Sequence, residues 1–322
     1  MDPERSQLLA GLVLDAWRRS PSAPEMWLAN TCTTPDELAD ARTLTRAARC
    51  LGALDGTGWE SGETRTGVGN YPARFSGGQI VGHYQILQWI GAGGMGEVFR
   101  ARDLALGREA ALKRLPRQFT TERRTRLLHE AEAFARLQHP AIATFYETGE
   151  AGGETFIAME YVEGETLRSR CKQGPLPLDD ALSIAKCLLE ALEHAHAAGI
   201  LHCDVKPENV MIPAAGSAKL LDFGIARHLL ARPADLNRRD SGATGLSASG
   251  QFVGTIGYMA PEQLLGEILD ARTDVFQVGV VLYEMLAGRP AFTGNSPLER
   301  LASVLSDVPD RDALSRPETP WI

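Results

Sequence analysis

A glycine-rich segment, Ile90–Val98, is the first part of the sequence whose residue types suggest a definite chemistry. Gly91, Gly93 and Gly96 lack side chains, so the backbone there can approach a polyphosphate closely and point N–H groups at it. Dinucleotide-binding folds share this spacing, but they need a helix that opens at the third glycine, and here the sequence continues as a strand. An ordinary glycine-rich hairpin remains the alternative for this segment taken alone.

Two charged residues follow at positions that allow either a structural or a functional role. Lys113 ends an apolar strand run, Ala110–Lys113, where a lysine would normally turn to solvent. Glu130 lies inside a predicted helix, in surroundings that equally suit a solvated helix face. A carboxylate close to Lys113 would change the interpretation of that lysine.

A second polar segment, Ile200–Val210, bears on both alternatives. It places Asp204, Lys206 and Asn209 among leucine and valine residues, and Asp222 follows after a predicted hairpin. Unpaired charge in apolar surroundings is costly, so these groups need partners. The segment therefore predicts a polar site rather than a plain core.

Together these motifs resemble the protein kinase superfamily, in particular the bacterial serine/threonine kinases of eukaryotic type. The match runs from about Tyr84 to Pro297 and keeps the order of the family's motifs. They are the glycine loop, the strand lysine, the helix glutamate, the catalytic loop around Asp204, Asp-Phe-Gly at 222–224 and Ala-Pro-Glu at 260–262. The resemblance implies an α+β, bilobal fold. Its N-lobe would hold a five-stranded antiparallel sheet and one main helix, and its C-lobe would be mainly helical.

The resemblance also implies the cofactors, ATP and magnesium. Lys113 is expected to hold the α- and β-phosphates and to pair with Glu130, whereas Asn209 and Asp222 are expected to bind the magnesium ions. The glycine loop from Ile90 onward would cover the phosphates.

The resemblance implies a division of labour in the transfer step itself. Asp204 is expected to orient the substrate hydroxyl and accept its proton, and Lys206 to steady the γ-phosphate. Lys206, together with Gly254 and Thr255, is typical of serine/threonine-specific members rather than tyrosine-specific ones. Thr255 is expected to hydrogen-bond Asp204 and Lys206.

The adenine site is likewise implied by position. Met159 corresponds to the gatekeeper, the backbones of Glu160 and Val162 are expected to hydrogen-bond adenine, and Val98 and Ala111 to sandwich it. Plain core packing is the alternative for Val98, Ala111 and Met159, and both roles can hold together.

Other positions match the stacked spine that the family assembles when active. These residues are Phe134, Phe145, His202 and Phe223, with Asp274 as their anchor on a buried helix. For His202 we favour a packed core histidine over a catalytic base.

The sequence departs from the family pattern at Cys203, where the family usually has an arginine that receives the activation-loop phosphate. A thiol cannot do that, so we hypothesise that phosphorylation between Asp222 and Glu262 is not an obligatory switch. The hydroxyls that remain open to modification there are Ser241, Thr244, Ser247 and Ser249, with Arg238 or Arg239 as partners. Cys203 itself is interpreted as a buried, inert thiol, with oxidation as the alternative.

A second departure concerns the residues after Gly288. They predict one more helix, Ser296–Leu305, and neither the family's last helices nor the arginine that usually pairs with Glu262 is found there. Arg311 and Arg316 lack a predicted helix that could hold them. A buried Glu262 without a partner would destabilise the C-lobe.

Hydrophobic periodicity predicts the elements that position these residues. The expected strands are Tyr84–Ile90, Gly96–Asp103, Arg108–Leu115, Ala143–Glu150 and Thr155–Tyr161. The expected helices are Thr121–Leu137, Leu178–Gly199, Arg272–Ala287 and Ser296–Leu305.

The first residues predict two helices of their own. Asp2-Pro3-Glu4 is a helix start followed by apolar residues at helical spacing, and Thr34-Pro35-Asp36-Glu37 is a capping box. A turn is expected around Pro24–Trp27. We therefore divide the chain into a helical segment at 1–54, a flexible glycine-rich linker at 55–78, a kinase N-lobe at 79–162 and a C-lobe at 163–322 that lacks its last helices.

Composition narrows the class of partner. The 33 Lys and Arg residues against 41 Asp and Glu give a net charge of −8, which provides no footprint for nucleic acid or an anionic membrane. Five scattered cysteines predict neither a disulfide framework nor a zinc site. With no secretory signal or membrane-spanning stretch in the sequence, we expect a cytoplasmic location. Anchoring through residues beyond 322 and dimer formation stay open.

Three functions compete. An active protein serine/threonine kinase, including autophosphorylation, is favoured because Lys113, Glu130, Asp204, Asn209 and Asp222 are all present. A pseudokinase, a nucleotide-binding signalling scaffold without turnover, is the alternative. A small-molecule phosphotransferase ranks third, because such enzymes lack the Ala-Pro-Glu segment that helps to form a peptide-docking platform. Residues 1–54 carry nothing catalytic and could be an interaction module, an autoinhibitory segment or a helical pair that packs on the catalytic domain. We expect ATP turnover to remain measurable when residues 1–75 are deleted.

Overall fold

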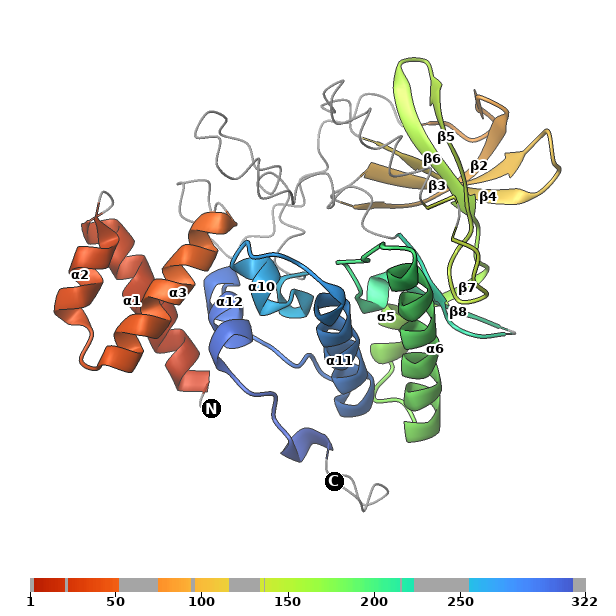
Figure 1. Ribbon diagram of the computed structural model, residues 1–322. Helices are drawn as coiled ribbons and strands as arrows, with labels where there is room; N and C mark the ends of the chain where they lie inside the picture. The colour runs from red at the N-terminus through yellow and green to blue at the C-terminus, as the bar shows by residue number, and fades with distance from the viewer. Residues whose placement is uncertain are drawn as a thin grey trace. The chain divides into compact units, whose positions relative to one another are not determined.

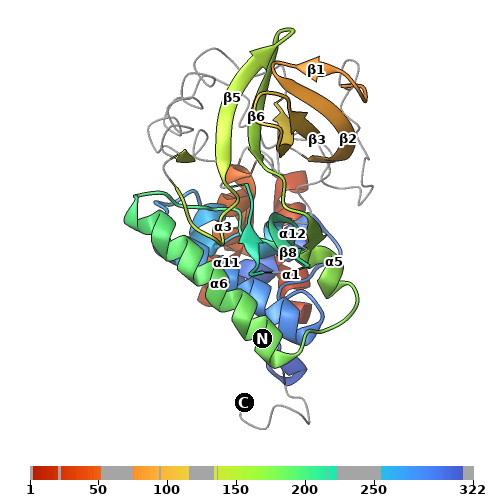
Figure 2. The ribbon, with the colours of Figure 1, turned by 90° about the vertical axis from the view of Figure 1, so that its right-hand side faces the viewer.

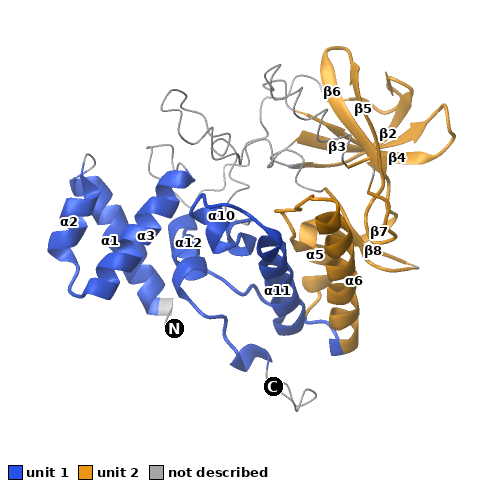
Figure 3. Ribbon diagram, viewed as in Figure 1, with its two compact units in different colours: residues 1–66, 175–178, 233–322 blue, residues 67–174, 179–232 orange. Residues whose placement is uncertain are grey.

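The computed structural model falls into two compact units, which are described separately (Figure 3). One comprises residues 1–66, 175–178 and 233–322, and the other residues 67–174 and 179–232. The structure describes residues 3–20, 23–51, 75–93, 96–115, 134–135, 137–214, 216–222 and 255–314.

The second unit begins with an antiparallel sheet of strand order β1-β2-β3-β4-β6-β5 (Figure 2). Its strands are β1 (Ile80–Val81), β2 (Tyr84–Gly93), β3 (Gly96–Asp103), β4 (Glu109–Arg114), β5 (Phe145–Ala151) and β6 (Glu154–Glu160). The five expected strands are confirmed, but the expectation of a five-stranded sheet is wrong by one. A two-residue strand such as β1 is too short to show any periodicity.

The register of the sheet separates its two faces. Val98 lies opposite Lys113, and Phe99 lies opposite Leu112. Because side chains alternate along a strand, Val98 and Lys113 share one face while Phe99 and Leu112 share the other. The Phe99 face forms the core of this sheet, a cluster of Phe75, Val81, Tyr84, Ile86, Phe99, Ala101, Ala110, Leu112, Phe156 and Ala158.

Short elements after the sheet carry the polar segment around Asp204. They are β7 (Gly164–Thr166), α5 (Leu167–Cys171), α6 (Leu178–Ala197), η1 (Pro207–Asn209), β8 (Val210–Pro213) and β9 (Lys219–Leu220). Strands β7, β8 and β9 pair antiparallel. Leu220 also hydrogen-bonds the backbone of Ala141 and Ala143, which ties β9 to the chain that enters β5. Helix α6 buries one apolar stripe, from Ala181 to Ala195.

The other unit is helical. It contains α1 (Pro3–Arg19), α2 (Pro24–Thr31), α3 (Pro35–Cys50), η2 (Ile256–Tyr258), α10 (Pro261–Leu264), α11 (Ala271–Ala287), α12 (Pro297–Ser306) and η3 (Asp312–Leu314). Helices α1 and α3 lie beside α12 (Figure 1). Thus the segment that opens the chain packs on one of the last helices described.

Side-chain caps explain where these helices begin. The Oγ1 atom of Thr34 accepts a hydrogen bond from the N–H of Glu37, and Ser296 caps α12 in the same way. The N-cap role of Thr34 is therefore confirmed, but the capping box is not complete, because the Glu37 carboxylate accepts from the N–H of Thr33 instead of that of Thr34. The turn expected around Pro24–Trp27 is wrong: Pro24 is the first residue of α2, where proline's missing N–H costs nothing.

Several expectations fall outside the described residues. They are residues 55–74 of the linker expected at 55–78, nearly all of the helix at 121–137, and the segment from Phe223 to Gly254 with its four hydroxyl residues. At the end of the expected linker, Phe75 is instead buried in the core of the sheet. Among the described residues, no helix is both long enough and apolar enough to cross a bilayer.

Candidate active site

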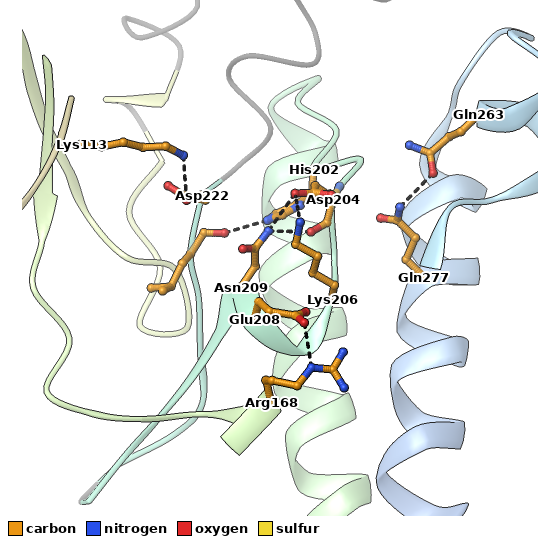
Figure 4. A network of polar contacts seen from close by, with 11 residues as sticks. Lys113, Arg168, His202, Asp204, Lys206, Glu208, Asn209, Asp222, Gln263 and Gln277 are labelled. Atoms are coloured by element: carbon orange, nitrogen blue, oxygen red, sulfur yellow. Dashed lines mark hydrogen bonds and ion pairs between the residues drawn. The ribbon is translucent and has the colours of Figure 1, made fainter. Parts of the chain in front are cut away.

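The catalytic-loop residues Asp204, Lys206 and Asn209 form a hydrogen-bonded cluster (Figure 4). The Oδ2 atom of Asp204 accepts from Lys206 Nζ at 2.9 Å and from Asn209 Nδ2 at 3.1 Å. The same amide nitrogen donates to the backbone carbonyl of Asp204 at 2.8 Å. Two donors on one oxygen fix the orientation of this carboxylate, which is what a group that must meet an incoming hydroxyl requires.

His202 links this loop to the chain before Asp222. Its Nδ1 accepts the backbone N–H of Asp204 at 3.1 Å, so in the neutral ring the proton sits on Nε2, which lies 2.9 Å from the carbonyl of Leu221. The N–H of Leu221 in turn donates to the carbonyl of Asn209 at 2.8 Å. These bonds hold Asp222 next to the catalytic loop, and they agree with a packed, structural role for the fully buried His202.

Asp222 pairs with the strand lysine. Lys113 Nζ lies 2.8 Å from Asp222 Oδ2, across 109 residues of sequence (Figure 4). The lysine side chain is 11 % exposed and the carboxylate 29 %. Lys113 is thus held beside a carboxylate and is not turned to solvent, so the structural alternative for this residue is wrong.

Backbone strain also marks this region. Among the described residues, the non-glycine residues with positive φ are Cys203, at 59°, and Asp222, at 47°. Such residues are uncommon and cluster at functional sites, where surrounding contacts hold them. Cys203 is buried, as expected for an inert thiol.

The face of the sheet that carries Lys113 also carries the residues expected around ATP. Gly91 lies opposite Val98, Val98 opposite Lys113, and Ala111 opposite Met159, so all of them share that face. Val98 and Ala111 are partly exposed and Met159 is buried. The register therefore brings the expected adenine and phosphate residues into one row.

Gly96 is the glycine whose conformation only glycine can adopt here. Its φ is +128°, and a Cβ atom at this position would lie 1.8 Å from the carbonyl oxygen of Arg114. A Cβ on Gly91, by contrast, would meet no atom within 4 Å. Gly96 thus lets β3 approach the end of β4, whereas the space over Gly91 is open.

The end of β6 is fixed by polar contacts of Glu160. Its carboxylate accepts from Lys219 on β9 and from the N–H of Thr144 at 3.1 Å. Burial raises the pKa of Glu160, but the hydrogen bonds from Lys219 and Thr144 outweigh burial and hold the pKa below its ordinary value. The carboxylate stays charged, which fixes the strand end between Met159 and the buried Val162.

Some expected site residues cannot be placed. Glu130 and Phe223 lie outside the described residues, so the expected pairing of Lys113 with Glu130 is not tested. Of the expected spine, Phe134 is buried and Phe145 is partly buried.

Sequence reasoning missed two structural pairs. Glu97 and Arg114 form a buried ion pair at 2.7 Å, on the sheet face opposite Lys113. Glu262, expected to lack a partner, accepts from Thr273 Oγ1 at 2.6 Å. The first pair follows from the register of β3 and β4 once the turn between them is known. The second joins α10 to α11, and no local signal announces it.

The protein kinase domain profile matches residues 84–318, which include every site residue described above. The chain belongs to the protein kinase family. The α+β protein-kinase fold expected from the motifs is therefore confirmed.

Named relatives agree with this assignment. The chain is 41% identical over 222 residues to the serine/threonine-protein kinase PknB of Mycobacterium tuberculosis, which covers 67% of this chain and 34% of that protein. It is 38% identical over 247 residues to the probable serine/threonine-protein kinase SCO3848 of Streptomyces coelicolor, covering 74% and 35%. The chain thus spans about a third of the length of these relatives.

Solved structures show the same fold. The PknI kinase domain of Mycobacterium tuberculosis superposes with a TM-score of 0.55 at 29% identity, covering 69% of this chain and 79% of that one. Members of this family generally use ATP and a divalent metal. The donor set fits such a ligand, since Asn209 and Asp222 supply the oxygen atoms that hard divalent cations prefer.

Proposed function

We propose that this protein is a serine/threonine kinase, which transfers the γ-phosphate of ATP to serine or threonine hydroxyls of proteins, itself included. The observation that supports this most is the convergence of Lys113, Asp204, Asn209 and Asp222. They come from a sheet strand, a loop, a short helix and the end of a hairpin, and all lie in one compact unit.

Asp204 is proposed to receive the substrate hydroxyl. Lys206 and Asn209 hold one of its oxygens, so the carboxylate is oriented before any substrate binds. From that position it can align the hydroxyl and take up its proton as the new O–P bond forms. Lys206, which is held beside Asp204, would neutralise charge that develops on the transferred phosphoryl group.

Lys113 and Asp222 are proposed to exchange partners when nucleotide binds. In the structure they form an ion pair at 2.8 Å. With ATP bound, the lysine would hold the α- and β-phosphates, and Asp222 with Asn209 would hold the metal ion. We propose magnesium as that ion, because its preference for oxygen ligands and phosphates matches this donor set; bound there, it would neutralise phosphate charge. Glu130 is proposed as the second partner of Lys113.

The adenine ring is proposed to lie on the sheet face of Lys113. Val98 and Ala111 would sandwich it, with Met159 at the back and the backbones of Glu160 and Val162 as hydrogen-bond partners. The phosphates would then lie under Ile90, Gly91, Gly93 and Gly96. The fixed end of β6 supports this arrangement, because a rigid hinge strand orients the base.

The same proposal extends to the organisation and partners of the chain. We keep the division into a helical segment at 1–54, a linker, an N-lobe and a C-lobe at 163–322, and we place the end of the linker expected at 55–78 before Phe75, which packs in the core of the sheet. The partners are ATP and proteins with accessible serine or threonine, in the cytoplasm, with no nucleic acid. Dimer formation is an open part of this proposal.

Transfer of radiolabelled phosphate tests the proposal. The full chain is incubated with γ-labelled ATP, a magnesium salt and a generic basic protein, beside the variant Asp204→Asn. We expect label on the kinase and on the basic protein, with loss of more than 100-fold in the variant, because the proton acceptor is gone while the fold and nucleotide site are kept. Nucleotide binding without any transfer by the unchanged chain would instead establish a pseudokinase.

A further inference from the structure

Helix α12 lies between the N-terminal helices and the segment 255–266, which contains the Ala-Pro-Glu motif. On one side, α1 and α3 pack on α12. On the other side, α12 packs on η2 and α10. All of these elements belong to one compact unit.

Helix α1 packs on α12 and also on α2 and α3, and a hydrogen bond from the buried Ser6 links it to the end of α12. The buried residues of α1 form one helical stripe: Ser6, Leu9, Ala10, Val13 and Ala16. At one end of this stripe, Ser6 Oγ lies 2.7 Å from both carboxylate oxygens of Asp307, the C-cap residue that follows α12. Ser6 is only 4 % exposed, so this bond lies inside the interface.

The contact with α3 reaches the end of α10. Arg46 Nη2 lies 3.3 Å from the carbonyl of Leu265 and 3.3 Å from Glu267 Oε1, and Cys50 Sγ lies 3.6 Å from the same carbonyl. Leu265 is the C-cap residue that follows α10. The last turn of α3 therefore supports the chain immediately after the Ala-Pro-Glu motif.

On its other side, α12 touches the chain immediately before that motif. A Cβ atom on Gly257 would lie 3.3 Å from the carbonyl of Phe292 and 3.6 Å from Arg300 Cδ, so the stem of Arg300 lies against the backbone of η2. Arg300 Nη2 also donates to the carbonyl of Gly294 at 3.3 Å, which keeps the side chain along its own helix. A shift of α12 would thus displace Gly257.

Helix α12 has little stability of its own. It spans ten residues, and helices of that length are marginal in water, so tertiary packing must hold it in place. Six of the ten residues are buried: Pro297, Leu298, Leu301, Ala302, Ser303 and Val304. Its position consequently depends on the elements that cover it, and α1 and α3 are among them.

We propose that α1–α3 is a positioning element for the protein substrate, which holds the segment 255–266 in place through α12 and α10. This inference rests on the proposed kinase function, in which that segment forms part of the peptide-docking platform. It is compatible with the expectation that ATP turnover remains measurable without residues 1–75, and it assigns the N-terminal helices a role toward the protein substrate. Deleting them would leave the ATP site intact but loosen the site for the protein substrate.

The test compares two neighbouring leucines of α1 in the full chain. Leu9 is 1 % exposed and lies on the stripe, whereas Leu8 is 56 % exposed and points away from it. We expect Leu9→Asp to raise the KM for a protein substrate at least fivefold while the KM for ATP stays within twofold. Leu8→Asp should leave both constants unchanged. Ser6→Ala, which removes one hydroxyl, serves as the milder variant should Leu9→Asp fail to fold, with a smaller rise in the same direction.

Hydrogen exchange of the backbone amides supplies an independent readout. In Leu9→Asp the amides of 256–266 should exchange at least tenfold faster, and those of β3 and β4 should not change. Fast exchange of α1 with unchanged exchange at 256–266 and an unchanged substrate KM would overturn the proposal. If the unchanged chain transferred no phosphate, the kinase proposal would fail, and exchange at 256–266 alone would still decide whether α1–α3 holds this segment.

Discussion

The two faces of the sheet hold different kinds of ion pair, as two neighbouring residues of β4 show. The site face is the one that carries Lys113, and the core face is the one that carries Phe99 and Leu112. On one face Lys113 is paired with Asp222, a partner from a distant hairpin that keeps some exposure. On the other face Arg114 is paired with Glu97, directly across from it on β3, with side chains 3 % and 2 % exposed. The first pair is the one that we propose exchanges partners when nucleotide binds, whereas the second is buried.

This difference shows that neighbouring residues of one strand can serve different purposes, one in the candidate site and the other in the stability of the fold. Because successive side chains point to opposite faces, one residue step takes the chain from the site into the core. A charge on the site face is useful because its partner can be replaced. A charge on the core face is tolerable only because its partner cannot leave.

The largest expected effect follows from removing the charge of Lys113 on the site face. Lys113→Ala should lower the rate of phosphoryl transfer about 10²–10³-fold, which is typical for removal of one charge-stabilising donor. The melting temperature should hardly change, because Asp222 is partly exposed and can be solvated. Kinetics and calorimetry on the same preparation measure both quantities. A variant that unfolds instead would show that Lys113 belongs to the core.

The next largest effect follows from breaking the Arg114–Glu97 pair on the core face. Arg114→Ala should lower the free energy of unfolding by about 3–5 kcal/mol, because it removes the charged partner of the buried Glu97 carboxylate. Chemical denaturation measures this change. The matched control is Arg100→Ala, which breaks the solvent-exposed pair Arg100–Glu109 on the same two strands and should change stability little. Equal stability of the two variants would contradict the distinction between the faces.

A third comparison uses two glycines of the glycine loop, Gly91 and Gly96. Gly96→Ala places a Cβ atom against the carbonyl of Arg114 at a strained φ, so it should lower stability by about 1–3 kcal/mol. Gly91→Ala meets open space, so it should keep the melting temperature and raise only the KM for ATP. Differential scanning fluorimetry and ATP titrations separate the two results. Unchanged melting of Gly96→Ala would show that β3 does not depend on this close approach.

The smallest expected effect is a pH dependence of stability that comes from Asp103, the last residue of β3, on the core face. Burial raises the pKa of this carboxyl, but hydrogen bonds from Leu106, Arg108 and Ala105 outweigh burial and hold it below its usual range. A depressed pKa stabilises the fold above the unfolded-state value of about 4, and this contribution is lost as pH falls through the folded-state value.

The corresponding experiment measures unfolding by urea from about pH 7 to about pH 2, a range that includes the unfolded-state pKa of Asp near 4 and the pH values below it. Asp103→Asn should be less stable than the unchanged chain at neutral pH, and the difference should shrink as the pH falls below about 4. A difference that stays constant down to acid pH would show that the charge on Asp103 contributes nothing.

Much of the sheet and the site could be predicted because the signals are local. Alternation over six to ten residues predicted β2, β3, β4 and β6, and β3 has the predicted bounds. Capping chemistry predicted the start of α3 at Thr34. The motifs around Asp204 and Asp222 predicted the polar cluster, because apolar neighbours leave such groups no alternative to pairing.

What could not be predicted depends on contacts between residues far apart in the chain. Ser6 and Asp307 are 301 residues apart, and nothing in either segment indicates the other. The partner of Glu262 is Thr273 because two helices meet there, a fact of packing rather than of sequence pattern. Strand β1 was missed for the opposite reason, since two residues show no period.

The central claim is that Lys113, on a strand, and Asp204, on a loop, act in one phosphoryl-transfer site. Rates of transfer from γ-labelled ATP by Lys113→Ala, Asp204→Asn and the double variant test it most directly. Residues that act as a unit show strongly non-additive losses, so the double variant should be about as slow as the slower single variant. Losses that multiply would show that the two residues act independently, and would contradict a single site.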